Sequence, residues 1–408
     1  MKMLRIILAF ALIFLLNIPI KCFAQFDNLA ITNVTVFTEP YKPPLENVTV
    51  LLKKGKFKEI GRSNKVKIPN GYRIINGEGK YITAGYWNSH VHFMEPKWNN
   101  AVNIPKDSLE AYLQEMFSSK GFVYVFDLAQ IDFENINTLR NIAQNSEIRS
   151  PTILSVGVPF TSKSPFYIEP LQLPELNTTE KVRNHVNHQI KNGANGIKLW
   201  SASPTGDYID YLSPSLIQEA AKITSNNKIP LFAHPSNLKG VENATENGVT
   251  VLTHVAADDR MVWSDSLVQK MIHRNVALIP TLKLHFWDLR LAGIETSNND
   301  LITTAINQLS TFSKAGGMVL FGTDVGYMND YETEEEFEQM HNAGMSFDQI
   351  LAALTVNPAE KFNFSNKTGV IKVGKNADLV VLDKNPSSDP RHFSSVFMTI
   401  HNGRIIFE

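Results

Sequence analysis

Hydrophobic positions alternate singly with polar ones near both ends of the chain. This period of two predicts strands at 30–37, 48–53, 56–60 and 72–76, with tight turns at Lys54-Gly55 and Asn76-Gly77. The pattern returns toward the end of the chain and predicts strands at 370–371, 378–382, 396–400 and 404–407. Neither segment is large enough to be stable alone, so we expect 25–80 and 365–408 to pair into one small β-sandwich.

Between 81 and 364 the pattern changes to continuous apolar strands that alternate with amphipathic helices. The predicted strands are 82–93, 122–129, 152–160, 196–201, 230–235, 249–255, 276–282 and 318–325. The clearest helical periods are at 181–191, 215–225, 264–274 and 301–314, and 347–362 reads as one more helix. Continuous apolar strands that alternate with helices indicate an α/β fold with a parallel sheet. Eight such units predict a closed, TIM-like (β/α)8 barrel.

The first two dozen residues have a different pattern, with basic residues followed by an apolar run. Lys2 and Arg5 precede an apolar run at 6–20, and Cys22-Phe23-Ala24 follows it. This layout predicts a secretory signal peptide at 1–24 and a secreted or periplasmic protein with no stable membrane association after cleavage. The alternative is an uncleaved membrane anchor, for which the run is short compared with a span of about 20 residues.

Composition narrows the range of partners. The 408 residues carry a formal net charge of −1, which gives no basic face for nucleic acid. We therefore expect a small-molecule substrate. The oligomeric state stays open, and a homo-oligomer is one option. Cys22 is the single cysteine, so the mature chain would contain no disulfide.

The candidate chemistry lies where the predicted barrel strands end, which is where such barrels place their catalytic residues. His90 and His92 are two residues apart on one strand, so both imidazoles point to the same side. Imidazole is the commonest protein ligand of zinc. Ligand-type side chains lie on strands one, four, five, six and eight: His90, His92, Lys198, His234, His254 and Asp324. Asp324 alone could be a helix N-cap, but a cap does not explain the other five.

This order of His-x-His, Lys, His, His and Asp resembles the amidohydrolase superfamily, especially its imidazolonepropionase-like and prolidase-like branch. The run at 81–90 and the tail at 369–383 and 402–404 are also similar to family motifs. Ala84 and Asn88 depart from the pattern, since Pro and Asp are usual there. The resemblance covers essentially the whole mature chain.

The resemblance implies a metal-dependent hydrolase with two divalent ions. His90, His92 and Asp324 would hold the more buried ion, and His234 and His254 the more exposed one. Lys198, N6-carboxylated to a carbamate, would bridge the ions together with a hydroxide. Zinc is the default for such ligands, although manganese, iron and cobalt also fit. Asp324 would act as general base and then general acid.

The expected reaction is hydrolysis of an amide or other non-ester C–N bond, with a dipeptide or N-acyl amino acid as the favoured substrate. One alternative is a mononuclear cyclic-amide hydrolase or deaminase in which Lys198 is unmodified. A lactonase or phosphotriesterase is a further variant, and a catalytically inactive binding barrel is the alternative of another class.

Three further residues are candidates for substrate binding. Tyr208 and Tyr211 follow strand four, and His285 follows strand seven, where loops carry function. Glu332 and Glu334–Glu336, by contrast, open the helix after strand eight, where acidic side chains complement the helix dipole.

Overall fold

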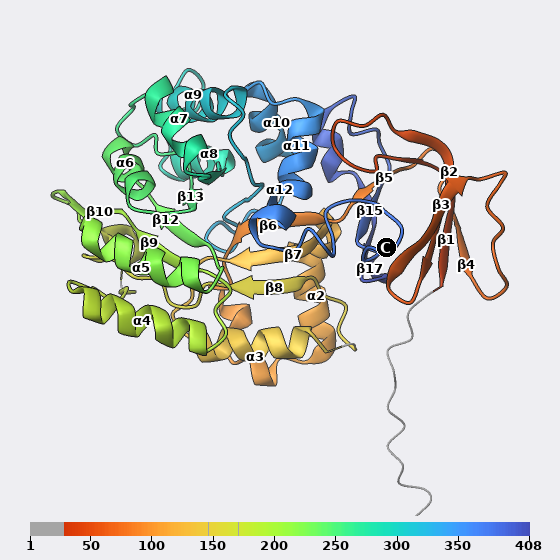
Figure 1. Ribbon diagram of the computed structural model, residues 1–408, viewed down its shortest axis with the longest axis horizontal. Coiled ribbons are helices and arrows are strands. Elements are labelled where there is room, and N and C mark those ends of the chain that lie inside the picture. Colours follow the sequence, from red (N-terminus) through yellow and green to blue (C-terminus); the bar gives the residue numbers. More distant parts are fainter. Residues whose placement is uncertain (1–27, 146, 170) are drawn as a thin grey trace, which may run out of the picture.

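A computed structural model describes residues 28–145, 147–169 and 171–408. Within them, a mixed α/β part adjoins a smaller part built from a predominantly antiparallel sheet (Figure 1). The predicted signal peptide at 1–24 lies outside the described residues. Among the helices of the described part, none has the length and apolar character needed to cross a membrane.

Both ends of the chain contribute to the smaller sheet, as predicted. Its central joint is the antiparallel pairing of β5 (Tyr81–Ala84) with β15 (Leu379–Leu382). The other strands are β1 (Leu29–Val36), β2 (Leu45–Lys53), β3 (Lys56–Arg62), β4 (Arg73–Asn76), β16 (Val396–His401) and β17 (Arg404–Phe407). Inward-facing apolar side chains from both ends form one buried cluster, so neither half has a core of its own.

The predicted two-sheet sandwich is instead one branched sheet. β1 pairs with β4 along its first half and with β5 along its second half. The register of β1 against β2 shifts on both sides of Val34, and Asn33 there has a φ of 59°. Such bulges bend a strand, which lets β1 pair with both β4 and β5. The predicted strand at 370–371 is also wrong, because the segment is irregular and is held by one hydrogen bond, from Ile371 N–H to Thr38 O (2.9 Å).

The α/β part contains two parallel sheets. One has three strands: β6 (Tyr86–Val91), β7 (Phe122–Asp127) and β8 (Thr152–Ser155). The other has four: β9 (Ile197–Trp200), β12 (Leu231–His234), β13 (Val251–Thr253) and β14 (Ala277–Ile279). A single parallel bridge between Phe160 and Leu199 links the segment after β8 to β9.

The predicted strand at 318–325 does not form a continuous ladder. Its backbone nevertheless bonds on both sides: Leu320 N–H donates to Leu278 O (2.8 Å), and Ser89 N–H donates to Phe321 O (2.8 Å). A Cβ at Gly322 would lie 2.4 Å from Ile279 and 2.9 Å from Cβ of His90, so only glycine permits this close approach. The segment therefore lies between β14 and β6 and carries Asp324 to the end of β6.

Helices follow most of the parallel strands, and those at 179–191, 214–226, 265–273 and 300–314 lie close to predicted helices. They are α2 (Lys106–Met116), α3 (Phe133–Ala143), α4 (Thr179–Lys191), α5 (Pro214–Asn226), α6 (Leu238–Glu246), α7 (Asp265–His273), α8 (Leu282–Leu291), α9 (Asp300–Lys314) and α10 (Glu334–Asn342). The helix predicted at 347–362 is two helices, α11 (Phe347–Leu354) and α12 (Val356–Lys361). Pro358 explains the break, since its ring clashes with the carbonyl four residues back, at Leu354.

A buried polar network joins the branched sheet to the parallel strands. Asp378 is 1% exposed. Its Oδ1 lies 2.8 Å from Nδ1 of His401 and accepts the backbone N–H of Asn402 at 2.8 Å. The other ring nitrogen of His401 lies 2.9 Å from the hydroxyl of Thr152 in β8. Burial raises the pKa of Asp378, but the His401 imidazole and the hydrogen bonds outweigh it and hold that pKa below its usual range.

We predict that Asp378→Ala lowers the free energy of unfolding by about 3–5 kcal/mol, because it leaves buried partners of the carboxylate unpaired. Urea denaturation at neutral pH measures this loss. Asp383→Asn is the matched control, since its exposed pair with Lys80 should contribute less than about 1 kcal/mol. Equal midpoints for the two variants would contradict the structural role of the network.

Candidate active site

The six predicted ligand side chains converge at one place, where β6, β9, β12, β13 and the 318–325 segment end. Oδ1 of Asp324 lies 2.8 Å from Nε2 of His92 and 3.2 Å from Nε2 of His90, and Oδ2 lies 3.8 Å from Nε2 of His254. One ligand atom from each of His90, His254 and Asp324 lies within 4.8 Å of the other two.

His234 and Lys198 complete the cluster. The imidazole of His234 lies 4.9 Å, centroid to centroid, from that of His254, and it stacks on Trp200 at 5.3 Å. The ammonium of Lys198 lies 5.2 Å from the centre of the Trp200 ring. Lys198 therefore faces the same space as the histidines, as its place on strand four led us to expect.

Burial sets the charge state of these groups. It lowers the pKa values of His90, His234 and His254, and the nearby charge of Lys198 lowers them further. The three imidazoles are consequently neutral near pH 7, which is the form that binds metals. Burial also lowers the pKa of Lys198 to about 7, against a smaller opposing effect of the Asp324 charge.

The buried polar atoms of this cluster fit a bound cation. Within the described part of the chain, both ring nitrogens of His90, Nδ1 of His92 and Oδ1 of Asp324 have no aligned hydrogen-bond partner. The nitrogen-to-oxygen separations above are short, yet none of these contacts is a hydrogen bond. An unsatisfied buried polar atom costs about 1–3 kcal/mol, and coordination to a cation would remove that cost.

Two of the candidate ligands occupy strained backbone conformations. His254 has a φ of 72° and Asp324 a φ of 62°, values that non-glycine residues rarely adopt. Next to Asp324, a Cβ at Gly326 would lie 1.9 Å from the carbonyl oxygen of His92. This close packing against His92 fixes the backbone beside Asp324.

Asn88, the departure noted in the sequence, ties the first strand to Asp324. Its Oδ1 accepts Thr323 N–H (3.2 Å), and its Nδ2 donates to the Thr323 hydroxyl (2.7 Å). Asp324 N–H donates to the carbonyl oxygen of His90 at 2.9 Å. An amide can both donate and accept, so asparagine fits this position where a carboxylate could only accept.

Thr281 fixes the tautomer of His254. Its hydroxyl donates to Pro280 O (2.8 Å) and lies 2.5 Å from Nδ1 of His254. Since the hydroxyl proton goes to the carbonyl, Nδ1 must be the protonated nitrogen that donates to Thr281. This leaves the lone pair of Nε2 facing Asp324, an arrangement typical of metal-ligating histidines.

Comparison with known proteins agrees with this geometry. Residues 81–406 match the model of the Amidohydrolase family. The chain belongs to the amidohydrolase family.

Curated relatives are about a quarter identical to this amidohydrolase over the stretches that align. An adenine deaminase of Clostridium perfringens is 23% identical over 93% of this chain, and the alignment spans only 59% of that relative. An imidazolonepropionase of Kosmotoga olearia is also 23% identical, over 93% of this chain and 98% of its own length. An ochratoxinase of Aspergillus niger is 26% identical over 54% of this chain and 48% of its own.

Solved structures share the fold. A protein of Bifidobacterium longum, provisionally assigned as a prolidase, has a TM-score of 0.81 at 24% identity and covers 94% of this chain and 95% of its own. A Xaa-Pro dipeptidase has a TM-score of 0.79 at 16% identity, covering 93% and 99%. At these identities the likeness is one of fold.

The predicted substrate-binding residues differ in their surroundings. His285 lies on α8, only 7% exposed, and its Nε2 has no hydrogen-bond partner among the described residues. Burial lowers the pKa of His285 to about 4, so it is a neutral donor or acceptor beside the cluster. Tyr211 accepts a bond from Asn237 Nδ2 (2.8 Å), whereas Tyr208 is 59% exposed at the tip of the β10 (Ala202–Pro204) and β11 (Ile209–Tyr211) hairpin.

Tyr167 was not predicted from the sequence. It lies in the short helix η4 (Phe166–Ile168), after β8, and its hydroxyl accepts the indole N–H of Trp200 at 2.7 Å. The same oxygen is 3.4 Å from Nε2 of His234. Burial raises the pKa of Tyr167 above its usual value, so the hydroxyl keeps its proton at neutral pH. No pattern in the sequence relates this loop residue to His234.

Glu334, Glu335 and Glu336 lie in the first turn of α10, as predicted, and Glu336 has a further contact that the sequence did not predict. It is fully buried, and Oε2 accepts the backbone N–H of Lys283 at 2.7 Å, in the first turn of α8. Thr281, the residue before α8, does not cap that helix, because its hydroxyl is hydrogen-bonded to Pro280 O and to His254 Nδ1. Glu336 thus provides the acceptor that the helix start requires. It is a structural support for α8 and the residues α8 carries.

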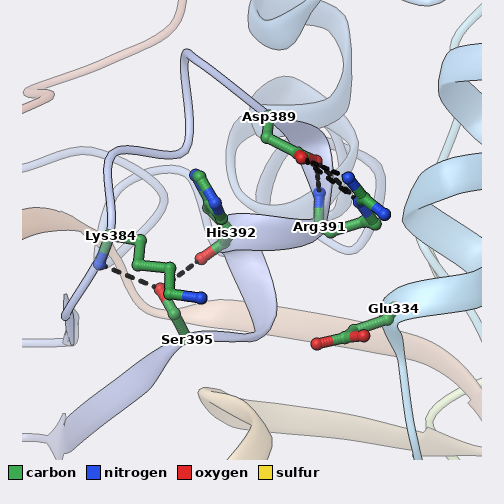
Figure 2. Close-up of a pocket in the computed structure, with 6 residues that line it drawn as sticks. All are labelled: Glu334, Lys384, Asp389, Arg391, His392 and Ser395. Atoms are coloured by element: carbon green, nitrogen blue, oxygen red, sulfur yellow. Dashed lines mark hydrogen bonds and ion pairs between the residues drawn. The ribbon is translucent and has the colours of Figure 1, made fainter.

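A surface pocket of about 220 Å³ lies elsewhere, beside α10 and the C-terminal segment (Figure 2). Its lining is Glu334, Lys384, Asp389, Arg391, His392 and Ser395. Asp389 and Arg391 pair with each other at 2.7 Å, and none of these residues belongs to the histidine cluster. We therefore place the chemistry at the cluster.

Glu336 gives a pH-dependent prediction. Burial raises its pKa from 4.5 to about 7, so between these pH values the folded protein holds a proton that the unfolded chain releases. The stability that Glu336 contributes is present below pH 4.5 and is lost as pH rises through about 7. The melting temperature of Glu336→Gln should therefore rise relative to that of wild type as the pH increases from 4.5 to about 7.

Differential scanning calorimetry at matched metal content measures that shift. Glu335→Gln is the control, because Glu335 pairs with Arg290 near the surface. A constant difference between Glu336→Gln and wild type from pH 4.5 to 7 would contradict the assignment.

Proposed function

We propose that the chain is a metal-dependent amidohydrolase that cleaves an amide or other non-ester C–N bond of a small substrate. A dipeptide or N-acyl amino acid is the favoured class. One observation carries the proposal: neutral imidazoles, a carboxylate and a lysine of lowered pKa meet in one buried cluster. The names of the relatives, which include deaminases, an imidazolonepropionase and a dipeptidase, agree with C–N bond chemistry.

In this proposal His90, His92 and Asp324 hold one divalent ion, and His234 and His254 hold the second. Zinc is the expected metal for such ligands. Bound divalent ions lower the pKa of water and polarise a carbonyl group. Asp324 lies against the imidazoles of His90 and His92, where it can accept the proton of the attacking water and deliver it to the leaving nitrogen.

Lys198 is proposed to carry a carboxyl group on Nζ. Carbon dioxide reacts with a neutral amine, and a pKa of about 7 leaves much of Lys198 neutral at physiological pH. The carbamate would replace an ammonium, which cannot coordinate a cation, with an anionic bridging ligand.

We also propose that the two parallel sheets and the 318–325 segment are parts of one closed (β/α)8 barrel. The supporting contacts are the bridges from Phe160 to Leu199, from Leu278 to Val319 and from Val91 to Val325. Export directed by 1–24 remains our proposal for the location.

A mononuclear hydrolase or deaminase is the second candidate. The tight grouping of His90, His254 and Asp324, which combines ligands of the two proposed ions, favours it. Metal analysis of the purified protein distinguishes the two forms: two ions per chain, with a Lys198 carbamate signal in NMR after labelling with isotopic bicarbonate, supports the binuclear site. One ion and no such signal would support the mononuclear form.

The activity itself is tested by screening metal-analysed protein against dipeptides and N-acyl amino acids. We expect Asp324→Asn to lower kcat by at least about 10³-fold, since it removes both a ligand and the proton acceptor. Asp265→Asn, an exposed carboxylate on α7, is the control. Wild-type protein that is fully loaded with metal, binds these compounds and turns none over would instead support a binding barrel.

A further inference from the structure

We infer that Lys283 is a positioning residue that holds His254 and Asp324 in place relative to each other and thereby sets the affinity of the cluster for divalent ions. The inference rests on the proposed function and deepens it. Lys283 does not belong to the candidate ligands. It acts through Thr281 on one side and through the segment that follows Asp324 on the other.

Lys283 is a buried cation in the first turn of α8, and it is only 1% exposed. Its Nζ lies 2.8 Å from Oδ2 of Asp330 and donates to the carbonyl oxygens of Asp330 (3.2 Å) and Glu332 (2.6 Å). An ammonium group has three N–H bonds, so these three acceptors use all of them. The backbone N–H of Lys283 donates to Glu336 at 2.7 Å, so both its side chain and its backbone are bonded to the same stretch of chain.

The segment that Lys283 binds is itself held by other parts of the molecule. The hydroxyl of Tyr331 lies 2.7 and 2.6 Å from the two carboxylate oxygens of Glu95, in the loop after β6. The next residue, Glu332, pairs with Lys120 at 2.6 Å. Neighbouring residues of this segment are therefore bonded to different elements, and Lys283 joins α8 to a fixed base.

That base continues from Asp324 through a tight turn. The backbone N–H groups of Tyr327 and Met328 both donate to the carbonyl oxygen of Asp324, at 3.2 and 3.3 Å. Met328 is fully buried, so the turn is packed into the protein interior. The position of the segment at 330–332 therefore constrains the position of Asp324.

On its other side, Lys283 lies two residues after Thr281. Thr281 accepts the Nδ1 proton of His254, and its φ of 44° is in the left-handed region. Such a conformation persists only where the surrounding structure holds it. The bonds of Lys283 hold the first turn of α8, which begins directly after Thr281. A continuous chain of contacts thus runs from Asp324 through Lys283 to His254.

Stability alone does not require a lysine at this position. A buried charge is costly to desolvate, and apolar residues that replace a buried ion pair are often neutral or stabilising. An apolar side chain cannot, however, make three directed bonds between two segments. Nε2 of His254 lies 3.8 Å from Oδ2 of Asp324, and metal binding requires that the two side chains keep such a relative position.

Lys283→Met tests the inference, because it keeps the length of the side chain and removes the three donors. We expect the affinity for Zn²⁺, measured by competition with a chromophoric chelator, to fall about 10–100-fold. The visible absorption bands of bound Co²⁺ report coordination geometry and should differ from those of wild type. Lys270→Met is the matched control, since it removes an exposed lysine of α7 that pairs with Glu246 at 2.6 Å, and it should leave both quantities unchanged.

Asp330→Ala is a second variant that removes one acceptor of Lys283 and keeps the two carbonyl acceptors. Its side chain is 42% exposed, so we expect the variant to fold and to lose Zn²⁺ affinity in the same direction, by a smaller factor. Should Lys283→Met not fold, this variant decides the question in the same way.

Unchanged Zn²⁺ affinity and an unchanged Co²⁺ spectrum in the folded variants would overturn the role of Lys283. A lower melting temperature with unchanged metal binding would also overturn it, because the lysine would then be a support of the fold only. Metal binding needs no turnover. Weakened binding in Lys283→Met, together with metal-loaded wild type that hydrolyses no amide, would therefore support the role of Lys283 and count against the proposed function alone.

Discussion

The candidate site depends on the junction between β6 and the 318–325 segment. These two stretches are more than two hundred residues apart in the chain, and the carboxamide of Asn88 and the carbonyl of His90 hold them together. The junction sets Asp324 against His90 and His92. Its tightness requires glycine at 322 and 326, where a side chain would collide with Ile279 and His90 or with the backbone of His92. The backbone strain at Asp324 persists because this packing over-determines it.

A second set of supports surrounds the cluster. Thr281 orients His254, Trp200 and Tyr167 flank His234, and Glu336 stabilises the start of α8. Each support uses a polar group bonded to a partner distant in sequence, and those of Thr281, Trp200 and Glu336 are buried. Such groups are costly when unpaired, so together they favour one arrangement of the ligands over its alternatives.

The sequence predicted the α/β class and the meeting of the six candidate side chains because both follow from local patterns. Alternation of period two marked the branched sheet, and continuous apolar strands marked the parallel sheets. The predictions were wrong where a residue's conformation depends on distant packing. The helix at 347–362 breaks at Thr355, and β1 bends at Asn33 to join two partners. Pro358 could have revealed the first of these, whereas the second depends on pairing across the chain.

The sequence by itself determined which residue types lie at the strand ends. The order of the residues and the two-residue period of a strand fix the position and face of each side chain along it. The six candidate ligands and the pairing of both chain ends were therefore predictable. Only the tertiary structure decided the charge states and the supporting contacts. Desolvation lowers the pKa values of Lys198 and the histidines, and desolvation depends on what the whole chain packs around them. For the same reason Tyr167 and Glu336 acquired roles that no local pattern could assign.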